Sequence, residues 1–343
     1  LPADRVLDLG PGPGERGGEI VFFGSPREPV TSAQTLTADY LAGRKRAGQP
    51  VRGSARLDGE RIEILGAAEH NLKDIDVAVP LHGLVCVTGV SGSGKSTLIQ
   101  DVLHAALLRA KGKPTEAPGA HRGIAGAELI DSVVLVDQTP IGRTTRSNPA
   151  SYVGAFDAIR KRFAAAPLAR EREYTQGTFS FNAGTGRCPT CGGNGFEHVE
   201  MQFLSDVYLR CPDCDGKRYR AEVLEVMIEG RSIADVLEMT VAEARTFFAG
   251  DRDIDAALAP LVEAGLEYLR LGQPVPTLSG GEAQRLKLAG FLTGIHGIDE
   301  PEPAHTRDKL PGFTRTGRPS AHPVRAPGTL FLFDEPTTGL HFD

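Results

Sequence analysis

The sequence contains a glycine-rich segment at residues 89–97 that could hold a nucleoside triphosphate. It reads GVSGSGKST and matches the pattern G-x-x-x-x-G-K-[ST]. In such a phosphate loop, backbone N–H groups surround the phosphates, the lysine reaches the β- and γ-phosphates, and the next hydroxyl ligates Mg²⁺. The predicted nucleotide-binding residues are Gly89, Ser91, Gly92, Gly94, Lys95, Ser96 and Thr97.

The flanks of the phosphate loop support this interpretation. Residues 84–88, LVCVT, predict a buried parallel strand in which Cys86 is a core residue. Residues 98–108 have apolar side chains at helical spacing, and residues 61–65 and 76–80 alternate as antiparallel strands do. The order of strand, glycine turn and helix directs a helix N-terminus at the phosphates.

A second apolar run ends in two carboxylates that could act on the same nucleotide. Residues 330–335, LFLFDE, predict a Walker B strand. Asp334 would hold Mg²⁺ through water, and Glu335 would polarise the attacking water as a general base. Residues 132–138, SVVLVDQ, predict another buried strand, which ends at Gln138.

Four of the five cysteines form two C-x-x-C pairs. Their spacing, C-x₂-C-x₁₉-C-x₂-C, lies in the range of zinc sites, and the predicted ligands are Cys188, Cys191, Cys211 and Cys214. Four protein ligands leave no open position, so we expect a structural Zn²⁺ site and not a catalytic one. A redox dithiol is the alternative.

A basic stretch is the sequence feature that could contact nucleic acid. Residues 143–172 contain seven Lys or Arg and two acidic residues, in a chain whose net charge is −6. This pattern is typical of a solvated helical face, but clustered cations also neutralise backbone phosphates. The candidate DNA contacts are Arg143, Arg146, Arg160, Lys161 and Arg162.

Composition favours an ordinary globular protein. Hydrophobic residues make up 40% of the 343 residues and charged residues 24%. No apolar run approaches the roughly 18 residues of a membrane span, and the first residues do not resemble a signal peptide. We therefore expect a cytoplasmic protein without membrane contact.

Residues 277–289, TLSGGEAQRLKLA, resemble the signature of ATP-binding cassette (ABC) ATPases. The resemblance implies that Ser279, Gly280 and Gly281, at a helix N-terminus, meet the γ-phosphate bound on an opposite cassette. It also implies that Gln138 contacts Mg²⁺ and the attacking water and transmits the nucleotide state to the helical lobe. We expect an α/β fold: an ABC-type P-loop ATPase core, with a mixed sheet and helices on both faces, and an inserted helical signature domain that carries the Cys₄ zinc module.

The motifs together resemble the UvrA family, the ABC ATPases of the bacterial excinuclease. The resemblance includes VDQTPIGRT at 136–144, RSNP at 146–149, the zinc-flanking GRC at 186–188 and GKRY at 216–219, and EPTTGLH at 335–341. It implies an ATPase with ATP, Mg²⁺ and Zn²⁺ as cofactors that recognises double-stranded DNA, preferentially damaged DNA, in bacterial nucleotide excision repair. It also implies tandem cassettes, a homodimer partner and handover to a downstream UvrB-like protein.

Within that family the chain resembles the second cassette and the tail of the first. We expect a tail and linker at residues 1–55, an ATP-binding core lobe at 56–145, a signature domain at 146–290, a flexible insertion at 291–328, and Walker B with the following loop at 329–343. The hairpin predicted in residues 1–30 could instead belong to the same cassette. The chain ends before the family's switch histidine and contains one complete P-loop only, without a second cassette, so we expect ATP binding with weak turnover. Residues 296–328 are also longer than the family leads us to expect between signature and Walker B.

Three alternatives remain open at this point. A UvrA-like drug self-resistance paralogue would share the motifs. The nucleotide-binding component of an ABC exporter would share the ATP site, but it has no need of a Cys₄ module. A zinc-binding interaction protein would not need Lys95 to bind a nucleotide.

Overall fold

The computed structural model describes residues 4–12, 17–25, 35–45, 59–139, 141, 146–199, 207–293 and 328–336. The chain divides into two compact units. The core unit contains residues 50–137 and 301–336, and the helical unit contains residues 1–49, 138–300 and 337–343. The division at residues 137 and 138 places the phosphate loop in one unit and the paired cysteines in the other.

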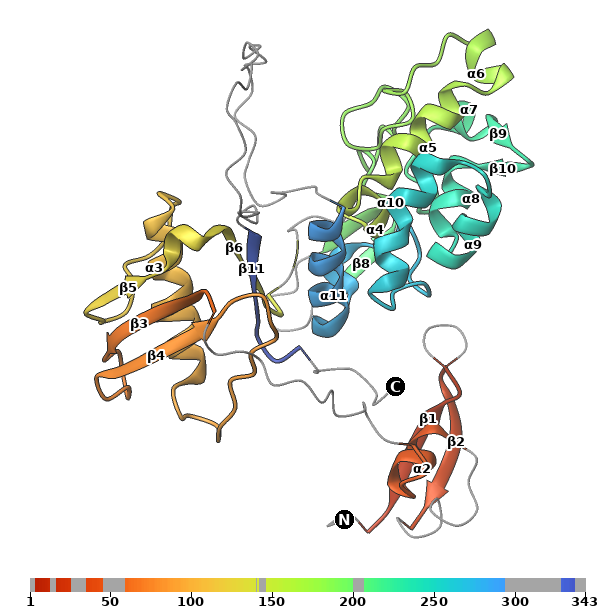
Figure 1. Cartoon of the computed structure of the whole chain (residues 1–343). Coiled ribbons are helices and arrows are strands. Elements are labelled where there is room, and N and C mark those ends of the chain that lie inside the picture. The colour runs from red at the N-terminus through yellow and green to blue at the C-terminus, as the bar shows by residue number, and fades with distance from the viewer. Residues whose placement is uncertain are drawn as a thin grey trace. The chain divides into compact units, whose positions relative to one another are not determined.

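The core unit contains one antiparallel sheet and one parallel strand pair. Strands β3 (Arg61–Ala67), β4 (Ile75–Pro80) and β5 (Gly123–Ala125) form a sheet in the order β4-β3-β5. After the 3₁₀ turn η3 (Ala127–Leu129), strand β6 (Ile130–Val136) pairs in parallel with β11 (Gly328–Phe333), as Figure 1 shows. These strands confirm the apolar runs predicted around residues 61–65, 76–80, 132–138 and 330–335.

A helix follows the phosphate loop and packs on these strands. It consists of the π-helical η2 (Thr97–His104) and α3 (Ala105–Ala110), which together cover the predicted helix. Val102, Leu103 and Leu107 are fully buried and share a core with Ile62 and Ile64 of β3. The helical period therefore buries one face against the sheet and leaves the polar face outside.

The predicted strand at residues 84–88 is wrong for this structure. Residues 84–90 form no regular element, Leu84 is 96% exposed, and Cys86 is exposed and not in the core. An apolar run becomes a strand only when a neighbouring strand offers its N–H and C=O groups. The pairing of the described core-unit strands is confined to β4-β3-β5 and β11-β6, so residues 84–88 have no partner among them.

In its described residues from 146 onward, the helical unit is built from short helices and two small hairpins. Its elements from residue 146 onward are α4 (Pro149–Tyr152), α5 (Ala155–Ala164), α6 (Pro167–Glu171), β7 (Phe196–Val199), β8 (Val207–Arg210), α7 (Ala221–Leu224), β9 (Met227–Ile228), β10 (Arg231–Ser232), α8 (Ile233–Glu238), α9 (Val241–Phe247), α10 (Arg252–Glu263), η4 (Val275–Thr277) and α11 (Gly280–Leu292). Capping boxes fix the N-termini of three of these helices. Ser232, Thr240 and Ser279 each form a capping box with the carboxylate three residues later.

One hydrophobic core joins the zinc-flanking loops to the helices of this unit. Phe163, Phe179 and Phe181 are fully buried and belong to the same cluster as Leu258 of α10 and Leu286 of α11. The rings of Phe163 and Phe179 lie 5.7 Å apart, and those of Phe156 and Phe181 lie 4.8 Å apart. Aromatic contacts at this spacing add to the apolar burial that holds the helices together.

The N-terminal residues form the predicted hairpin. Strand β1 (Val6–Gly10) pairs antiparallel with β2 (Glu19–Gly24), and the short helix α2 (Leu36–Leu41) follows. Its assignment to a preceding cassette stays a prediction, as do the other segment boundaries. Most of the predicted insertion, residues 294–327, and the loop at 337–341 lie outside the described residues. Among the described helices, none has the length and apolar character needed to cross a membrane.

Replacing a buried leucine should test the packing of the helical unit. Leu258→Ala removes a side chain that is 0% exposed, and we expect it to lower the free energy of unfolding by about 2–5 kcal/mol. Leu292→Ala is the matched control, because Leu292 is 52% exposed and its loss should change stability by no more than about 0.5 kcal/mol. Urea unfolding measures both, and equal effects would contradict the described core.

Candidate functional site

The phosphate loop has the backbone shape that an anion site needs. Gly92 and Gly94 have φ values of 76° and 95°, in the left-handed region. A Cβ at Gly94 would lie 2.8 Å from Asn71 Oδ1, so a larger residue does not fit there. Asn71 also donates a hydrogen bond to the Gly92 carbonyl at 2.9 Å, which ties the loop to the turn between β3 and β4.

Lys95 lies over the glycine-rich turn that would bind the phosphates. Lys95 Nζ donates hydrogen bonds to the carbonyls of Gly89 and Val90, at 3.0 and 2.9 Å. Ser96 and Thr97 follow at the start of the helix, where N–H groups have no partner within the helix. A cation and a helix N-terminus at one turn favour a polyphosphate.

The Walker B carboxylate reaches the helix that follows the phosphate loop. Asp334 comes directly after β11, and its N–H donates to the Val136 carbonyl at 3.2 Å. Gln100 Nε2 of η2 donates to Asp334 Oδ2 at 2.7 Å, although the two residues are 234 positions apart. The fold therefore brings Asp334 and the segment after Lys95 into one site within the core unit.

Glu335 and Gln100 add detail that the motifs do not contain. Glu335 has a φ of 47°, which is uncommon for a residue with a side chain and is a form of strain found at functional positions. Sequence reasoning did not identify Gln100. The signal that could have indicated it is an amide one helical turn beyond the phosphate loop, next to the buried Leu98 and Val102.

The signature residues begin helix α11. Ser279 Oγ accepts a hydrogen bond from the Glu282 N–H, and Glu282 Oε2 accepts one from the Ser279 N–H at 2.8 Å. Gly280 and Gly281 form the first turn, where their N–H groups remain available to an anion. A Cβ placed on Gly280 would lie 3.3 Å from Gln138 Oε1. Gln138 and Gly280, which were predicted from separate motifs, thus lie together in the helical unit.

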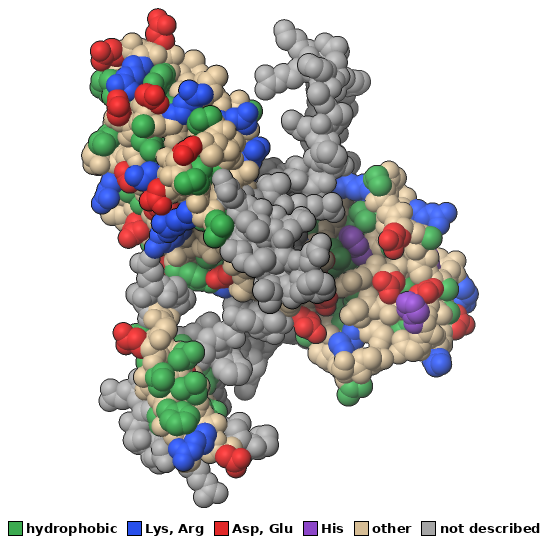
Figure 2. Space-filling model, turned by 180° about the vertical axis from the view of Figure 1, so that it is seen from behind, with side chains coloured by type: hydrophobic (Ala, Val, Ile, Leu, Met, Phe, Trp, Pro, Cys, Tyr) green, Lys and Arg blue, Asp and Glu red, His purple; other side chains and the backbone are tan. Residues whose placement is uncertain are grey.

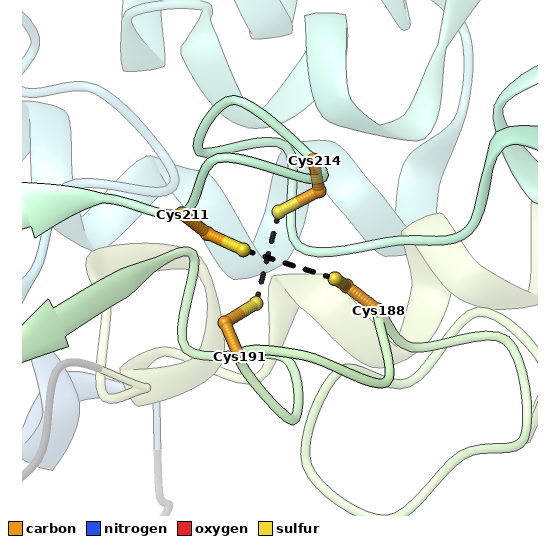
Figure 3. Close-up of side chains that lie close together, drawn as sticks. All are labelled: Cys188, Cys191, Cys211 and Cys214. Atoms are coloured by element: carbon orange, nitrogen blue, oxygen red, sulfur yellow. Dashed lines mark hydrogen bonds between the residues drawn. The ribbon is translucent and has the colours of Figure 1, made fainter.

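The four paired cysteines converge on one point, as Figure 3 shows. Their sulfur atoms all lie within 4.8 Å of one another, with Cys188 and Cys211 at 4.0 Å and Cys191 and Cys214 at 3.7 Å. A tetrahedral zinc ion with Zn–S bonds of about 2.3 Å separates its sulfur ligands by about 3.8 Å. The thiols are buried, so the donor set and its spacing fit a closed Zn²⁺ site.

The pKa values of these thiols follow from their surroundings. Burial raises the pKa of Cys214 to about 12 and also raises that of Cys191. Burial opposes ionisation of Cys188 too, but the N–H groups of Cys191 and Thr190 outweigh it and lower its pKa. A metal that takes these sulfurs as thiolates must displace protons, so its affinity should fall as the pH falls.

The candidate DNA contacts are mostly engaged within the chain. Arg146 donates to Asn194 Oδ1 at 2.8 Å and to the Gly192 carbonyl at 3.2 Å, so it binds the loop of the first cysteine pair. Arg160 bonds to Asp157 and covers the Phe156 ring, and Arg162 pairs with Asp251 at 3.3 Å. Lys161 is exposed, and Arg143 lies outside the described residues.

The charged side chains on the visible surface are also of mixed sign. Figure 2 shows Lys and Arg side chains interspersed with Asp and Glu on the face in view, where they do not form one continuous basic area. The predicted DNA contacts therefore stay predictions. Lys161 and Arg162 are the candidates with exposed positions on α5, and Arg162 also pairs with Asp251.

Known proteins resemble this chain along its whole length. UvrABC system protein A of Thermus thermophilus is 47% identical over 341 residues, which are 99% of this chain and 33% of that protein. The Bacillus subtilis protein of the same name is 46% identical over 343 residues, which are 100% of this chain and 33% of that protein. No protein-family model matches the chain. The chain thus spans about a third of the length of the curated relatives it matches.

A solved structure also matches this chain over most of its length. The crystal structure of UvrA2 from Deinococcus radiodurans matches with a TM-score of 0.80 and 44% sequence identity, over 98% of this chain and 37% of that one. This match confirms the expected fold, an ABC-type α/β ATPase core with an inserted signature domain. The names of the two relatives refer to the UvrABC system and not to a transporter.

Metal content should test the cysteine site. We expect one Zn²⁺ per chain after purification, and Cys214→Ser should lose most of it because three ligands remain for a metal that prefers four. Cys86→Ser is the matched control, since Cys86 is the exposed fifth cysteine and should keep the metal. Elemental analysis with a colorimetric zinc assay measures this. A wild-type chain without zinc, or equal loss in both variants, would contradict the site.

Proposed function

We propose that this chain, which belongs to the UvrA family, is the ATP-binding and DNA-contacting part of a damage-recognition protein in bacterial nucleotide excision repair. One observation carries the proposal. A chain whose sequence matches the family along its whole length also has Asp334 hydrogen-bonded to the helix after the phosphate loop, so that the residues we propose for Mg²⁺ and ATP belong to one unit. By analogy with its relatives, we also place this protein in the cytoplasm.

The proposed ATP chemistry assigns one task to each residue. Lys95 and the glycines of the phosphate loop bind the triphosphate, with Ser96 and Asp334 positioned to hold Mg²⁺, which would neutralise the developing charge on the phosphates. Glu335 is the general base that orients and deprotonates the attacking water. Gln138, next to Gly280, would report the state of the nucleotide to the signature helix.

The signature helix supports a site completed by a second cassette. Ser279 and the first N–H groups of α11 form an anion-binding end, yet they belong to a different unit from Lys95. In the proposed assembly this end meets the γ-phosphate on an opposite cassette, either within the longer protein or in a homodimer. ATP then closes the two cassettes together, and hydrolysis releases them.

DNA would be recognised by shape rather than by base sequence. We propose that closure bends the duplex and that a damaged duplex, whose stacking is weakened, is easier to bend. Contacts to backbone phosphates would position the protein, with Lys161 and Arg162 as candidates. Handover to a UvrB-like protein would follow. These steps belong to the whole protein and are inferred from its family.

Loss of the phosphate-loop lysine should test the ATP site. Lys95→Ala removes a charged hydrogen-bond donor to the phosphates, and we expect ATP binding to weaken by about 10- to 150-fold. Lys113→Ala is the control, because Lys113 is an exposed lysine of the same unit. Isothermal titration with Mg²⁺ and ATP measures both. Unchanged binding by Lys95→Ala would favour a zinc-binding interaction protein.

A further inference from the structure

We propose that Arg218 couples the four-cysteine site to the loop that leads into the signature helix, so that zinc binding orders residues 270–279. Arg218 is a positioning residue and takes no part in the chemistry of ATP. The inference rests on the Zn²⁺ site proposed for the four paired cysteines, and it does not depend on ATP hydrolysis. The backbone of Arg218, its side chain and its charge each contribute to the coupling.

The backbone of Arg218 contacts both cysteine pairs. Its N–H hydrogen-bonds to the sulfur of Cys214, in the second pair. Its carbonyl accepts a hydrogen bond from the N–H of Cys188, in the first pair, at 2.8 Å. Arg218 adopts a φ of 73°, a conformation that disfavours side chains and persists only where the surroundings impose it. The position of Arg218 therefore depends on both halves of the metal site.

The side chain of Arg218 runs from the cysteines into the protein. Only 4% of the residue is exposed. The guanidinium carbon lies 5.0 Å from the centre of the Phe181 ring, and Nη2 donates a hydrogen bond to the Gly272 carbonyl at 3.1 Å. Arginine on an aromatic face with a directed donor is a well-defined geometry that lysine reproduces poorly.

Gly272 belongs to the segment that ends at the signature. Its N–H donates to the Leu237 carbonyl at 2.7 Å, and a Cβ at Gly272 would lie 2.9 Å from that carbonyl oxygen. The segment is thus held between α8 on one side and Arg218 on the other. It continues through η4 to Ser279, which caps α11. A shift of Arg218 would consequently reach the first turn of the signature helix.

Charge strengthens this connection when metal is bound. Four thiolates around one Zn²⁺ have a net charge of −2, and a buried anion needs a compensating cation. Arg218 is a buried cation whose backbone contacts Cys214, so it lies close to this charge. A bound metal stabilises the four sulfurs as thiolates, and without it burial favours their protonated forms. Metal occupancy therefore changes how firmly Arg218, and with it Gly272, is held.

The wild-type chain provides the first part of the test. We expect removal of zinc by a chelator to speed amide hydrogen exchange at residues 270–279, and restored zinc to slow it again. Exchange in α10, which packs against α5, α9 and α11, serves as the internal reference. Equal acceleration in both segments, or none at residues 270–279, would overturn the inference because the coupling would be general unfolding or absent.

Variants of Arg218 provide the second part. Arg218→Gln should weaken zinc binding by about 10- to 100-fold, as loss of a partner in the outer shell of a metal site does. Exchange at residues 270–279 should then be fast even with zinc bound. Arg218→Lys keeps the charge and should lose less zinc affinity. Its amide hydrogen exchange at residues 270–279 should still be faster than in the wild type. Arg245→Gln is the control, since Arg245 pairs with Asp255 of α10.

The measured zinc affinities distinguish the role of Arg218 from the existence of the zinc site. Zinc affinity is measured by competition with a chromophoric chelator. Zinc binding by Arg218→Gln within about twofold of the wild type overturns the role of Arg218 and leaves the metal site intact. A wild-type chain that binds no zinc overturns both. If Arg218→Gln does not fold, Arg218→Lys and the exchange of the wild type still decide the question.

Discussion

Four buried thiols within 4.8 Å of one another are the constraint on which the helical unit depends. They come from two turns that are distant in sequence, and burying them as thiolates is costly unless a metal compensates their charge. Their loops are fixed in turn by the unit's core: Gly193 lies so close to the Phe181 carbonyl that no side chain fits, and the Tyr219 hydroxyl donates to the Phe179 carbonyl at 2.8 Å. The four-cysteine cluster and the aromatic core therefore form one structure.

The candidate site of the core unit is held by different interactions. Its site is made of backbone groups and charges, and the long-range contact in it is the hydrogen bond between Gln100 and Asp334. That bond joins the helix after the phosphate loop to the segment after β11, so the proposed triphosphate and Mg²⁺ positions share one support. In the proposed function, each unit supplies one half of an ATP sandwich: Lys95 and Asp334 in the core unit, Ser279 in the helical unit.

Local chemistry explains which features could be predicted from the sequence. The cysteine spacing, the serine that caps α11 and the alternating strands are set within a few residues, and the structure has them where the patterns indicated. The prediction for residues 84–88 was wrong because an apolar run does not specify a strand partner. Gln100, Arg218 and the contacts of Arg146 were beyond sequence reasoning, because each role arises from residues brought together from 46 to 234 positions away.

The central claim of the proposed function is that this chain is the ATP-binding and DNA-contacting part of a protein that recognises distorted duplex DNA. It is tested most directly by the chain's affinity for matched duplexes with and without one bulky lesion. Fluorescence anisotropy with Mg²⁺ and ATP, repeated across a salt series, gives both the preference and the number of phosphates contacted. We predict affinity that falls steeply with salt and is higher for the duplex with the lesion. Equal affinity for the two duplexes, or no binding at low salt, would contradict the claim.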